Sequence, residues 1–235
     1  MRLNLCAKTR VGYALVICLM LSGALLLGGC RDKISTRDSD TGKEAPKPDV
    51  KKGVKPVADT EAAVVETEFG NIVIELYPNL APKTVERFKQ LIKDGFYNGT
   101  TFHRINSAAG LLQGGDPLSK DDNPENDGTG SSSYPNLPHE FNDIPYERGT
   151  VGAARQGEGP GLTTQQAWDT ANCQFFITLL RQDTFDGQYT VFGRVIDGVT
   201  NADVIAHAPV VPGTESPSPK IVIKSIKLVP RSNYK

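Results

Sequence analysis

Apolar and polar residues divide the chain into three segments with different patterns. An unbroken apolar run extends from Val11 to Leu27 and is followed by residues 31–60, which have almost no apolar periodicity. From Glu61 onward, short apolar runs are separated by turn residues, as in a folded domain. We therefore expect one domain over residues 61–230, preceded by two appendages and followed by a short tail, residues 231–235.

The start of the domain has the pattern of a β-hairpin followed by a helix. β-prone residues fill 62–69 and 71–77, and Gly70-Asn71 at their junction predicts a hairpin turn. Farther along, apolar residues at helical spacing from Val85 to Ile92 predict a helix. Pro82 suits its first turn, where the missing N–H of proline costs no hydrogen bond.

Further β-prone runs bring the number of predicted strands to eight. A short helix is expected around Asn201 to His207, with Thr200 as its cap. Many short strands with few helices favour a closed barrel or a sandwich over an alternating α/β fold, and the pattern does not choose between the two. The remaining predicted strands are the two halves of Phe102–Pro117, then Gly149–Arg155, Gln174–Leu179, Thr190–Ile196 and Lys220–Val229.

The stretch from Phe102 to Pro117 carries the most suggestive chemistry. If its first half is a strand, Phe102 and Arg104 share one face of the sheet. Gln113, an amide that both donates and accepts, stands just before two glycines. Arginine and glutamine beside apolar side chains predict a site that holds a polar carbonyl and an apolar ring together.

The first 29 residues have the layout of a targeting segment, with basic residues, the apolar run and small residues before Cys30. They resemble a bacterial lipoprotein signal peptide, residues 1–29, after which Cys30 receives lipid. An uncleaved membrane helix and a plain secretory signal are the alternatives. The lipoprotein interpretation predicts a protein of the bacterial cell envelope, anchored to a membrane through Cys30, with its domain facing the periplasm or the exterior.

Residues 30–60 are rich in Lys, Asp, Pro and Gly and contain too little apolar surface to order themselves. We interpret them as a flexible linker between the lipid anchor and the domain. A flexible coil of this length extends over roughly 30 Å. The linker would therefore hold the domain clear of the lipid headgroups.

Charge and cysteine content argue against several function classes. The formal net charge is −1 and no basic stripe is present, so nothing indicates nucleic-acid binding. Cys173 is the only cysteine in the predicted domain, which rules out a disulfide within it, and we interpret it as a buried apolar residue. The three histidines show no ligand spacing, which argues against a transition-metal site.

Residues Leu118 to Pro138 form a long polar excursion that partly matches a calcium-binding loop. Asn123, Glu125 and Asp127 fall at the first, third and fifth positions of that pattern. Tyr134 stands at the twelfth, where a bidentate Glu is expected, and no flanking helices are predicted. We favour a solvated loop, with calcium as the alternative.

Six blocks of residues, in order, give the domain a resemblance to a known family. They resemble the cyclophilins, a family of peptidyl-prolyl cis-trans isomerases, over about residues 61–230. The resemblance implies a closed eight-stranded antiparallel barrel capped by two helices, proline-containing polypeptides as partners, no cofactor or metal, and a monomer. The blocks are Gly70–Tyr77, Ala81–Val85, Phe102–Ile105, Gln113–Asp116, Gln174–Ile177 and Asp186–Gly193.

The same resemblance implies roles for individual residues. Arg104 takes the place of the catalytic arginine, and Gln113 that of the glutamine that holds the arginine and the substrate. Phe176 would form the floor of the proline pocket and Leu111 a wall. Without the resemblance, Phe176 and Leu111 would be interpreted as barrel core and Arg104 as part of a surface salt bridge. The other implied substrate-binding residues are Ala154, Gln174, Phe185 and Tyr189.

The sequence departs from the family pattern beside the pocket. Eight residues separate Arg104 from Gln113 where the family commonly has seven, and Gly110 or Ala109 replaces the pocket phenylalanine. The loss removes an apolar contact worth about 1 to 3 kcal/mol, which Phe185 would partly restore. These changes predict weakened activity and weak cyclosporin binding.

Catalysis of this kind requires no nucleophile and no cofactor. Rotation about an X-Pro bond is opposed by a barrier of roughly 18 to 20 kcal/mol, and a guanidinium can donate to the amide nitrogen once the bond is twisted. The leading hypothesis is an isomerase that acts on envelope proteins as they fold. The alternative is a module on the same barrel that binds prolyl peptides or partners with little catalysis, which the altered turn and the acidic loop favour.

Overall fold

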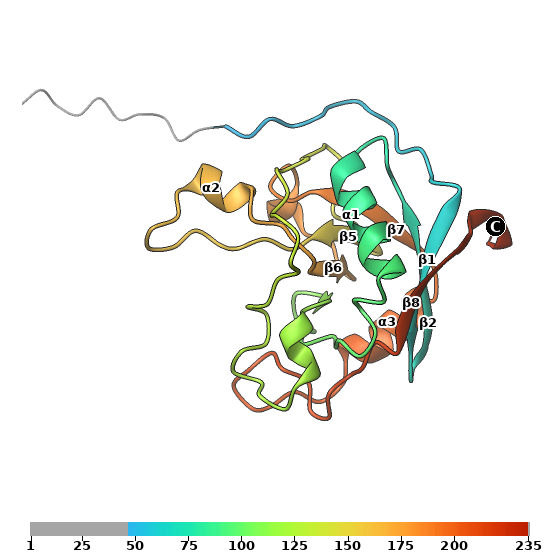
Figure 1. Cartoon of the computed structure of the whole chain (residues 1–235), viewed down its shortest axis with the longest axis vertical. Coiled ribbons are helices and arrows are strands. Elements are labelled where there is room, and N and C mark those ends of the chain that lie inside the picture. The colour runs from blue at the N-terminus through green and yellow to red at the C-terminus, as the bar shows by residue number, and fades with distance from the viewer. Residues whose placement is uncertain (1–46, 235) are drawn as a thin grey trace, which may run out of the picture. The chain divides into compact units, whose positions relative to one another are not determined.

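The strands of the domain form one antiparallel sheet. The computed structural model describes residues 47–234 (Figure 1), and within them eight strands are hydrogen-bonded in the order β3-β4-β6-β5-β7-β2-β1-β8. The predicted number of strands is confirmed, and so is the hairpin, in which β1 pairs with β2. The strands are β1 (Glu61–Thr67), β2 (Gly70–Leu76), β3 (Arg104–Asn106), β4 (Leu111–Gly114), β5 (Thr150–Ala153), β6 (Phe175–Thr178), β7 (Val191–Asp197) and β8 (Ser225–Pro230).

The sheet curls into half a barrel and does not close. The two edge strands, β3 and β8, are not paired with each other, so the prediction of a closed barrel is wrong. The strand predicted from Lys220 begins only at Ser225, because residues 221–223 bind residues 99–102 instead. The backbone hydrogen bonds between these two segments are 2.8–2.9 Å long. Irregular chain, and not a pair of strands, therefore lies between the two edges.

Three α-helices occur within residues 47–234, where two were predicted. The additional helix, α2, is a short one inside a loop, and it forms because Thr163 and Gln166 make a capping box at its start. The last helix, α3, follows Gly198, which has a left-handed φ of 72°. Thr200 therefore lies inside α3 and does not cap it, contrary to the prediction. The helices are α1 (Pro82–Lys93), α2 (Thr164–Trp168) and α3 (Val199–Ala206).

The main apolar core lies between α1 and the sheet. Phe88 of α1 contacts Phe175 of β6 and Phe192 of β7, with ring centroids 5.5 and 5.2 Å apart. Phe102 is fully buried in this core, whereas Arg104 is exposed. The prediction that Phe102 and Arg104 share one face is wrong, because β3 begins only at Arg104 and the residues before it do not alternate as a strand.

Residues 51–60 lie on the domain, although they were predicted to belong to the flexible linker. Lys51 forms two backbone hydrogen bonds with residues 141–143, one as donor at 2.9 Å and one as acceptor at 3.0 Å. The Asp59 carboxylate pairs with the Lys89 ammonium of α1 at 2.9 Å. The linker prediction is therefore wrong in this last part.

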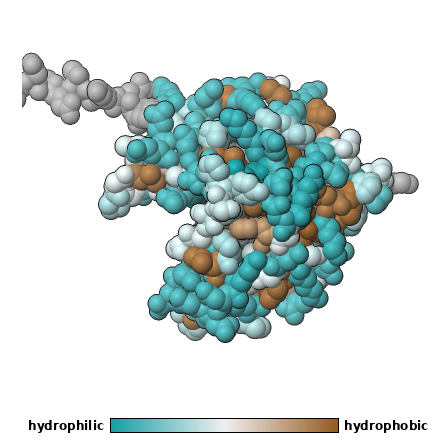
Figure 2. Space-filling view, viewed as in Figure 1, coloured by the Kyte–Doolittle hydropathy of each residue, from teal (hydrophilic) through white to brown (hydrophobic). Residues whose placement is uncertain are grey.

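The signal peptide predicted at residues 1–29, Cys30 and the first part of the predicted linker lie outside the described residues. None of the helices within residues 47–234 has both the length and the apolar character needed to cross a bilayer. On the face shown in Figure 2, hydrophobic side chains are scattered among hydrophilic ones. The predicted tail forms a short turn, Arg231–Asn233, held by an ion pair between Arg231 and Glu75.

Candidate active site

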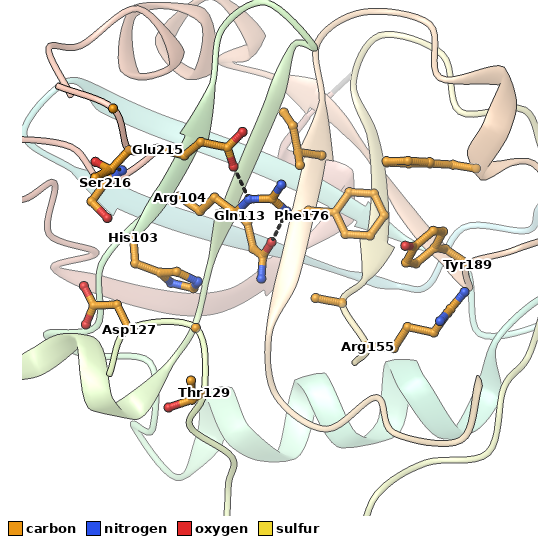
Figure 3. A pocket seen from close by; sticks show the side chains of 16 residues that line it. His103, Arg104, Gln113, Asp127, Thr129, Arg155, Phe176, Tyr189, Glu215 and Ser216 are labelled. Atoms are coloured by element: carbon orange, nitrogen blue, oxygen red, sulfur yellow. Dashed lines mark hydrogen bonds and ion pairs between the residues drawn. The ribbon is translucent and has the colours of Figure 1, made fainter. Parts of the chain in front are cut away.

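A pocket of about 580 Å³ opens on the side of the sheet that faces away from the main core (Figure 3). Strands β3, β4 and β6 and several loops contribute side chains to it. Of the residues predicted to form the site, all except Gln174 line this pocket, and Gln174 lines a smaller pocket beside it. The predicted residues in the larger pocket are Arg104, Leu111, Gln113, Ala154, Phe176, Phe185 and Tyr189.

Strand register explains why Arg104, Gln113 and Phe176 meet. Gln113 of β4 is paired with Arg104 of β3 on one side and with Phe176 of β6 on the other. Paired residues on neighbouring strands project to the same face of a sheet, so the three side chains form a row. Gly152 of β5 is paired with Phe176, and a Cβ atom there would overlap the Phe176 ring and the Tyr146 hydroxyl. The absence of a side chain at Gly152 therefore leaves room for the aromatic ring.

A chain of hydrogen bonds orients the polar half of the pocket. Arg104 Nη1 donates to Gln113 Oε1 at 3.3 Å, and Gln113 Nε2 donates to Gln174 Oε1 at 3.0 Å. Gln174 Nε2 in turn donates to the carbonyls of Gly128 and Gly130, at 3.0 and 2.9 Å. Both polar atoms of the Gln174 side chain are thus engaged inside the protein. Gln174 therefore influences the site by holding Gln113.

Glu215 is a second partner of Arg104, which the sequence did not reveal. Its carboxylate forms an ion pair with Arg104 Nε (Figure 3) and accepts a hydrogen bond from the Asn106 amide. The Glu215 carbonyl accepts from the Ile105 N–H at 2.7 Å, which fixes this loop against the edge of β3. Glu215 is 111 residues from Arg104, and no spacing rule links the two positions. The salt bridge that was the alternative interpretation of Arg104 does form, and it forms at the rim of the pocket.

Aromatic side chains form the other half of the pocket. Phe176 stacks on Tyr146 with ring centroids 5.5 Å apart, and Phe185 and Tyr189 stand edge-on to Phe176 at 5.7 and 5.6 Å. Leu111 belongs to the same buried cluster. Tyr146 was not among the predicted site residues, and burial raises the pKa of its phenol well above the ordinary value. The floor of this half is therefore apolar and uncharged, and the Arg155 guanidinium lies 4.5 Å from the centroid of the Tyr189 ring beside it.

Comparison with known proteins identifies the family in which this arrangement occurs. The family model described as "Cyclophilin type peptidyl-prolyl cis-trans isomerase/CLD" matches residues 62–228. The chain belongs to the cyclophilin family. A "Probable peptidyl-prolyl cis-trans isomerase" of Brucella suis is 37% identical over 173 residues, which cover 72% of this chain and 83% of the relative. "Peptidyl-prolyl cis-trans isomerase-like 3" of Gallus gallus is 35% identical, with 71% and 95% covered.

Solved cyclophilins share the fold of this chain. A cyclophilin type peptidyl-prolyl cis-trans isomerase of Cryptosporidium parvum, crystallised in the presence of the dipeptide Ala-Pro, aligns with a TM-score of 0.61 and 27% identity. The alignment covers 72% of this chain and 98% of that structure. Together with the names of the curated relatives, the family match shows that this cyclophilin is a peptidyl-prolyl cis-trans isomerase.

The turn between β3 and β4 explains why no phenylalanine stands where the cyclophilin pattern places one in the pocket. Gly110 has a left-handed φ of 62°, and a Cβ atom there would lie 2.7 Å from the Leu180 backbone nitrogen. No side chain therefore fits at residue 110 without moving the backbone. Phe185 packs edge-on against Phe176 and restores part of the apolar wall.

Two further titratable residues lie on the side of the pocket away from the aromatic rings (Figure 3). His103 and Asp127 line the pocket there, near the Arg104–Glu215 pair. Burial lowers the pKa of His103, and neither nitrogen of its ring has a hydrogen-bond partner among residues 47–234. Burial also raises the pKa of Asp127. These two residues were not predicted to belong to the site.

The polar loop for which calcium was the alternative interpretation, and Cys173, have structural explanations. The Asp121 carboxylate accepts from the Asn123 N–H at 2.8 Å, and the Asn123 side chain accepts from the Glu125 N–H at 3.1 Å. Within residues 47–234, no group of His, Cys, Asp and Glu side chains is arranged to hold a metal ion. Burial raises the pKa of Cys173 to about 12, which keeps its thiol protonated and unreactive.

Proposed function

We propose that this cyclophilin accelerates rotation about X-Pro bonds by holding the proline ring in the aromatic hollow while Arg104 donates to the amide nitrogen. Twisting the bond ends the delocalisation of the nitrogen lone pair, which can then accept a hydrogen bond. The uncatalysed rotation takes tens to hundreds of seconds. Reaching milliseconds requires an acceleration of about 10⁴- to 10⁵-fold, or roughly 6 to 7 kcal/mol of preferential transition-state binding.

The observation that carries this proposal is the row of Arg104, Gln113 and Phe176, which sets a charged donor beside an apolar ring site. The guanidinium remains charged at any physiological pH. Gln113 and Glu215 hold its Nη1 and Nε, and within residues 47–234 its Nη2 has no protein partner. One preorganised donor of this kind supplies about 3 to 4 kcal/mol, by analogy with oxyanion-stabilising groups. Apolar packing and positioning supply the remainder.

The peptide backbone that precedes the proline is proposed to bind at Ala154. The Ala154 N–H already donates to the Gln174 carbonyl at 3.0 Å. The Ala154 carbonyl is therefore the group that is left for a peptide N–H. Because the Gln174 side chain is fully engaged, we assign it the positioning of Gln113 in place of direct substrate binding.

NMR exchange spectroscopy on an Ala-Pro test peptide tests the role of Arg104. With the full-length chain we expect catalysed cis-trans interconversion that falls at least about tenfold in Arg104→Ala, the effect of losing a donor that acts mainly in the transition state. Arg148→Ala is the matched control, because Arg148 pairs with Asp203 and does not line the pocket. An Arg104→Ala variant with full activity would contradict the assignment.

Two observations favour a prolyl-peptide binding module as the second candidate. Glu215 neutralises part of the Arg104 charge, which weakens its donation, and the turn at Gly110 leaves the pocket with one aromatic ring fewer than the family pattern. In the same NMR experiment this second function would appear as shifts of peptide resonances on binding, without faster exchange. That outcome would replace the catalytic proposal.

We further propose that the enzyme acts as a lipid-anchored monomer on envelope proteins as they fold. The support is the sequence of residues 1–30, with its signal-like layout and Cys30 at the boundary. Metabolic labelling with a radioactive fatty acid is expected to label the wild-type protein and not Cys30→Ser. A wild-type protein without label would contradict the anchor and leave the isomerase assignment untouched.

A further inference from the structure

A smaller pocket of about 240 Å³ adjoins the proposed active site and is continuous with it. Gln113, Ala154 and Arg155 line both pockets. Every other residue that lines the smaller pocket is uncharged. This includes Cys173, because burial raises the pKa of its thiol to about 12 and the thiol stays protonated. Among residues 47–234, Arg155 is therefore the only residue lining this second pocket that carries a formal charge, and it also lines the larger pocket.

The Arg155 guanidinium is fixed in place but its charge is not compensated. It lies 4.5 Å from the centroid of the Tyr189 ring. Its Nε donates to the Gln188 carbonyl at 3.2 Å, and its Nη1 donates to the Gln156 carbonyl at 3.0 Å. No carboxylate within residues 47–234 forms an ion pair with it, whereas Arg104 at the other side of the pocket pairs with Glu215. A ligand carboxylate could therefore approach Arg155 without displacing a protein partner.

We propose that Arg155 makes this cyclophilin select proline-containing polypeptides with an acidic side chain one or two residues before the proline. This inference rests on the proposed function, in which the proline occupies the aromatic hollow and the preceding backbone binds at Ala154. The residues before the proline then lie in the smaller pocket, beside the guanidinium. A guanidinium binds a carboxylate more strongly than a neutral amide, and a fixed one loses less conformational freedom in doing so.

The positions of the other charged residues of the site also favour an acidic side chain before the proline over one after it. Asp127 and Glu215 line the larger pocket, and both lie apart from Arg155 (Figure 3). On that side Glu215 is already paired with Arg104, so a second carboxylate would find no uncompensated positive charge there. The site therefore distinguishes a carboxylate before the proline from a carboxylate after it.

Exchange spectroscopy on a peptide series tests the selection. The peptides carry Glu, Gln or Lys at the first or second position before the proline, or at the first position after it. With the full-length chain at low salt, we expect kcat/KM for Glu to exceed that for Gln by about fivefold to tenfold at a preceding position. The ratio should shrink as salt is added. Equal values for Glu and Gln at both preceding positions, or a preference for Glu only after the proline, would overturn the proposal.

Charge variants identify the residue responsible. In Arg155→Gln, we expect kcat/KM for the Glu peptide to be about equal to kcat/KM for the Gln peptide. In Arg155→Glu, we expect kcat/KM to be highest for the Lys peptide. Arg148→Gln, at a surface arginine outside both pockets, should leave the ratio as in wild type. A ratio that persists in Arg155→Gln would overturn the assignment to Arg155.

The same peptides separate this inference from the proposed function. If no peptide shows faster exchange, the isomerase proposal fails, and dissociation constants from NMR titration still report whether Glu is preferred over Gln. If all peptides are isomerised at equal rates, the isomerase proposal stands and the acidic preference is refuted.

Discussion

Phe175 and Phe176 are neighbours in β6, and they belong to different parts of the molecule. Phe175 lies in the main core, where its ring meets those of Phe88 and Tyr97 at 5.5 and 5.8 Å. Phe176 faces the other way and forms the floor of the pocket against Tyr146. Successive residues of a strand project to opposite faces of the sheet. Phe175 therefore contributes to the stability of the core, whereas the next residue, Phe176, contributes to the pocket.

What differs between the two rings is their surroundings and not their burial. Phe175 is 1% exposed and Phe176 is 3% exposed. The neighbours of Phe175 are apolar core residues, whereas Phe176 lies beside Arg104, Gln113 and a cavity of about 580 Å³. Burial alone therefore does not identify a core residue. A ring that is packed on one side and faces a cavity on the other is a rigid platform for a ligand.

The largest effect is expected when the core ring is removed. Phe175→Ala should lower the free energy of unfolding by about 3 to 5 kcal/mol, because it leaves a closed cavity that its neighbours cannot fill. Urea denaturation followed by fluorescence measures this change. A loss of unfolding free energy below about 1 kcal/mol would show that the core side of the sheet tolerates loss of an aromatic ring as well as the open pocket does. That result would contradict the difference described between Phe175 and Phe176.

Removal of the pocket ring should affect activity more than stability. Phe176→Ala is expected to lower kcat/KM for an Ala-Pro peptide at least about tenfold, since an apolar platform of this size contributes about 1.5 to 3 kcal/mol. Its unfolding free energy should fall less than that of Phe175→Ala, because water can enter the open pocket. The two variants are compared by exchange spectroscopy and urea denaturation. Equal losses of stability with unchanged activity in Phe176→Ala would refute the division of roles.

A smaller effect is expected at Glu215, which orients Arg104 from the rim of the pocket. The pair is partly exposed, with 45% and 37% of the two side chains accessible, so its contribution to stability should be below about 1 kcal/mol. Glu215→Ala should lower kcat/KM about threefold to fivefold, and Glu215→Gln, which keeps an oxygen acceptor, should recover most of that loss. A higher kcat/KM in Glu215→Ala would show that the carboxylate restrains catalysis by neutralising the guanidinium.

The smallest expected effect is on the pH dependence of stability. It involves a second pair of neighbours that face different parts of the molecule, Phe102 in the core and His103 at the pocket. Burial lowers the pKa of His103 below its ordinary value of 6.5, so the unfolded chain binds a proton more readily than the folded one. The resulting stability is complete above pH 6.5 and is lost as the pH falls toward the folded-state pKa. His103→Gln should therefore show a shallower loss of stability between about pH 7 and pH 5 in urea denaturation. An unchanged slope would show that His103 is not the group that titrates.

The sequence by itself determined the number of strands, the first hairpin and helix, and the central row of the site. The β1–β2 hairpin and α1 follow from turn residues and periodicity, which depend on residues close together in the chain. Arg104, Gln113 and Phe176 lie within short blocks that match the cyclophilin pattern, and the structure places them side by side as paired strand residues. Strand pairing sets the positions of all residues in a block at once. The three blocks were therefore sufficient to predict that these side chains lie together.

Only the tertiary structure revealed the remaining contacts of that row and the path of the chain around it. Tyr146 packs against Phe176 and Glu215 pairs with Arg104, both from loops far along the chain, and no local pattern connects them to the row. Residues 51–60 contain too little apolar surface to predict order, yet backbone hydrogen bonds and an ion pair hold them on the domain. The sheet stays open because residues 221–223 bind residues 99–102 before β8 begins. Each of these contacts joins segments that are distant in sequence, and its stability depends on the whole fold being in place.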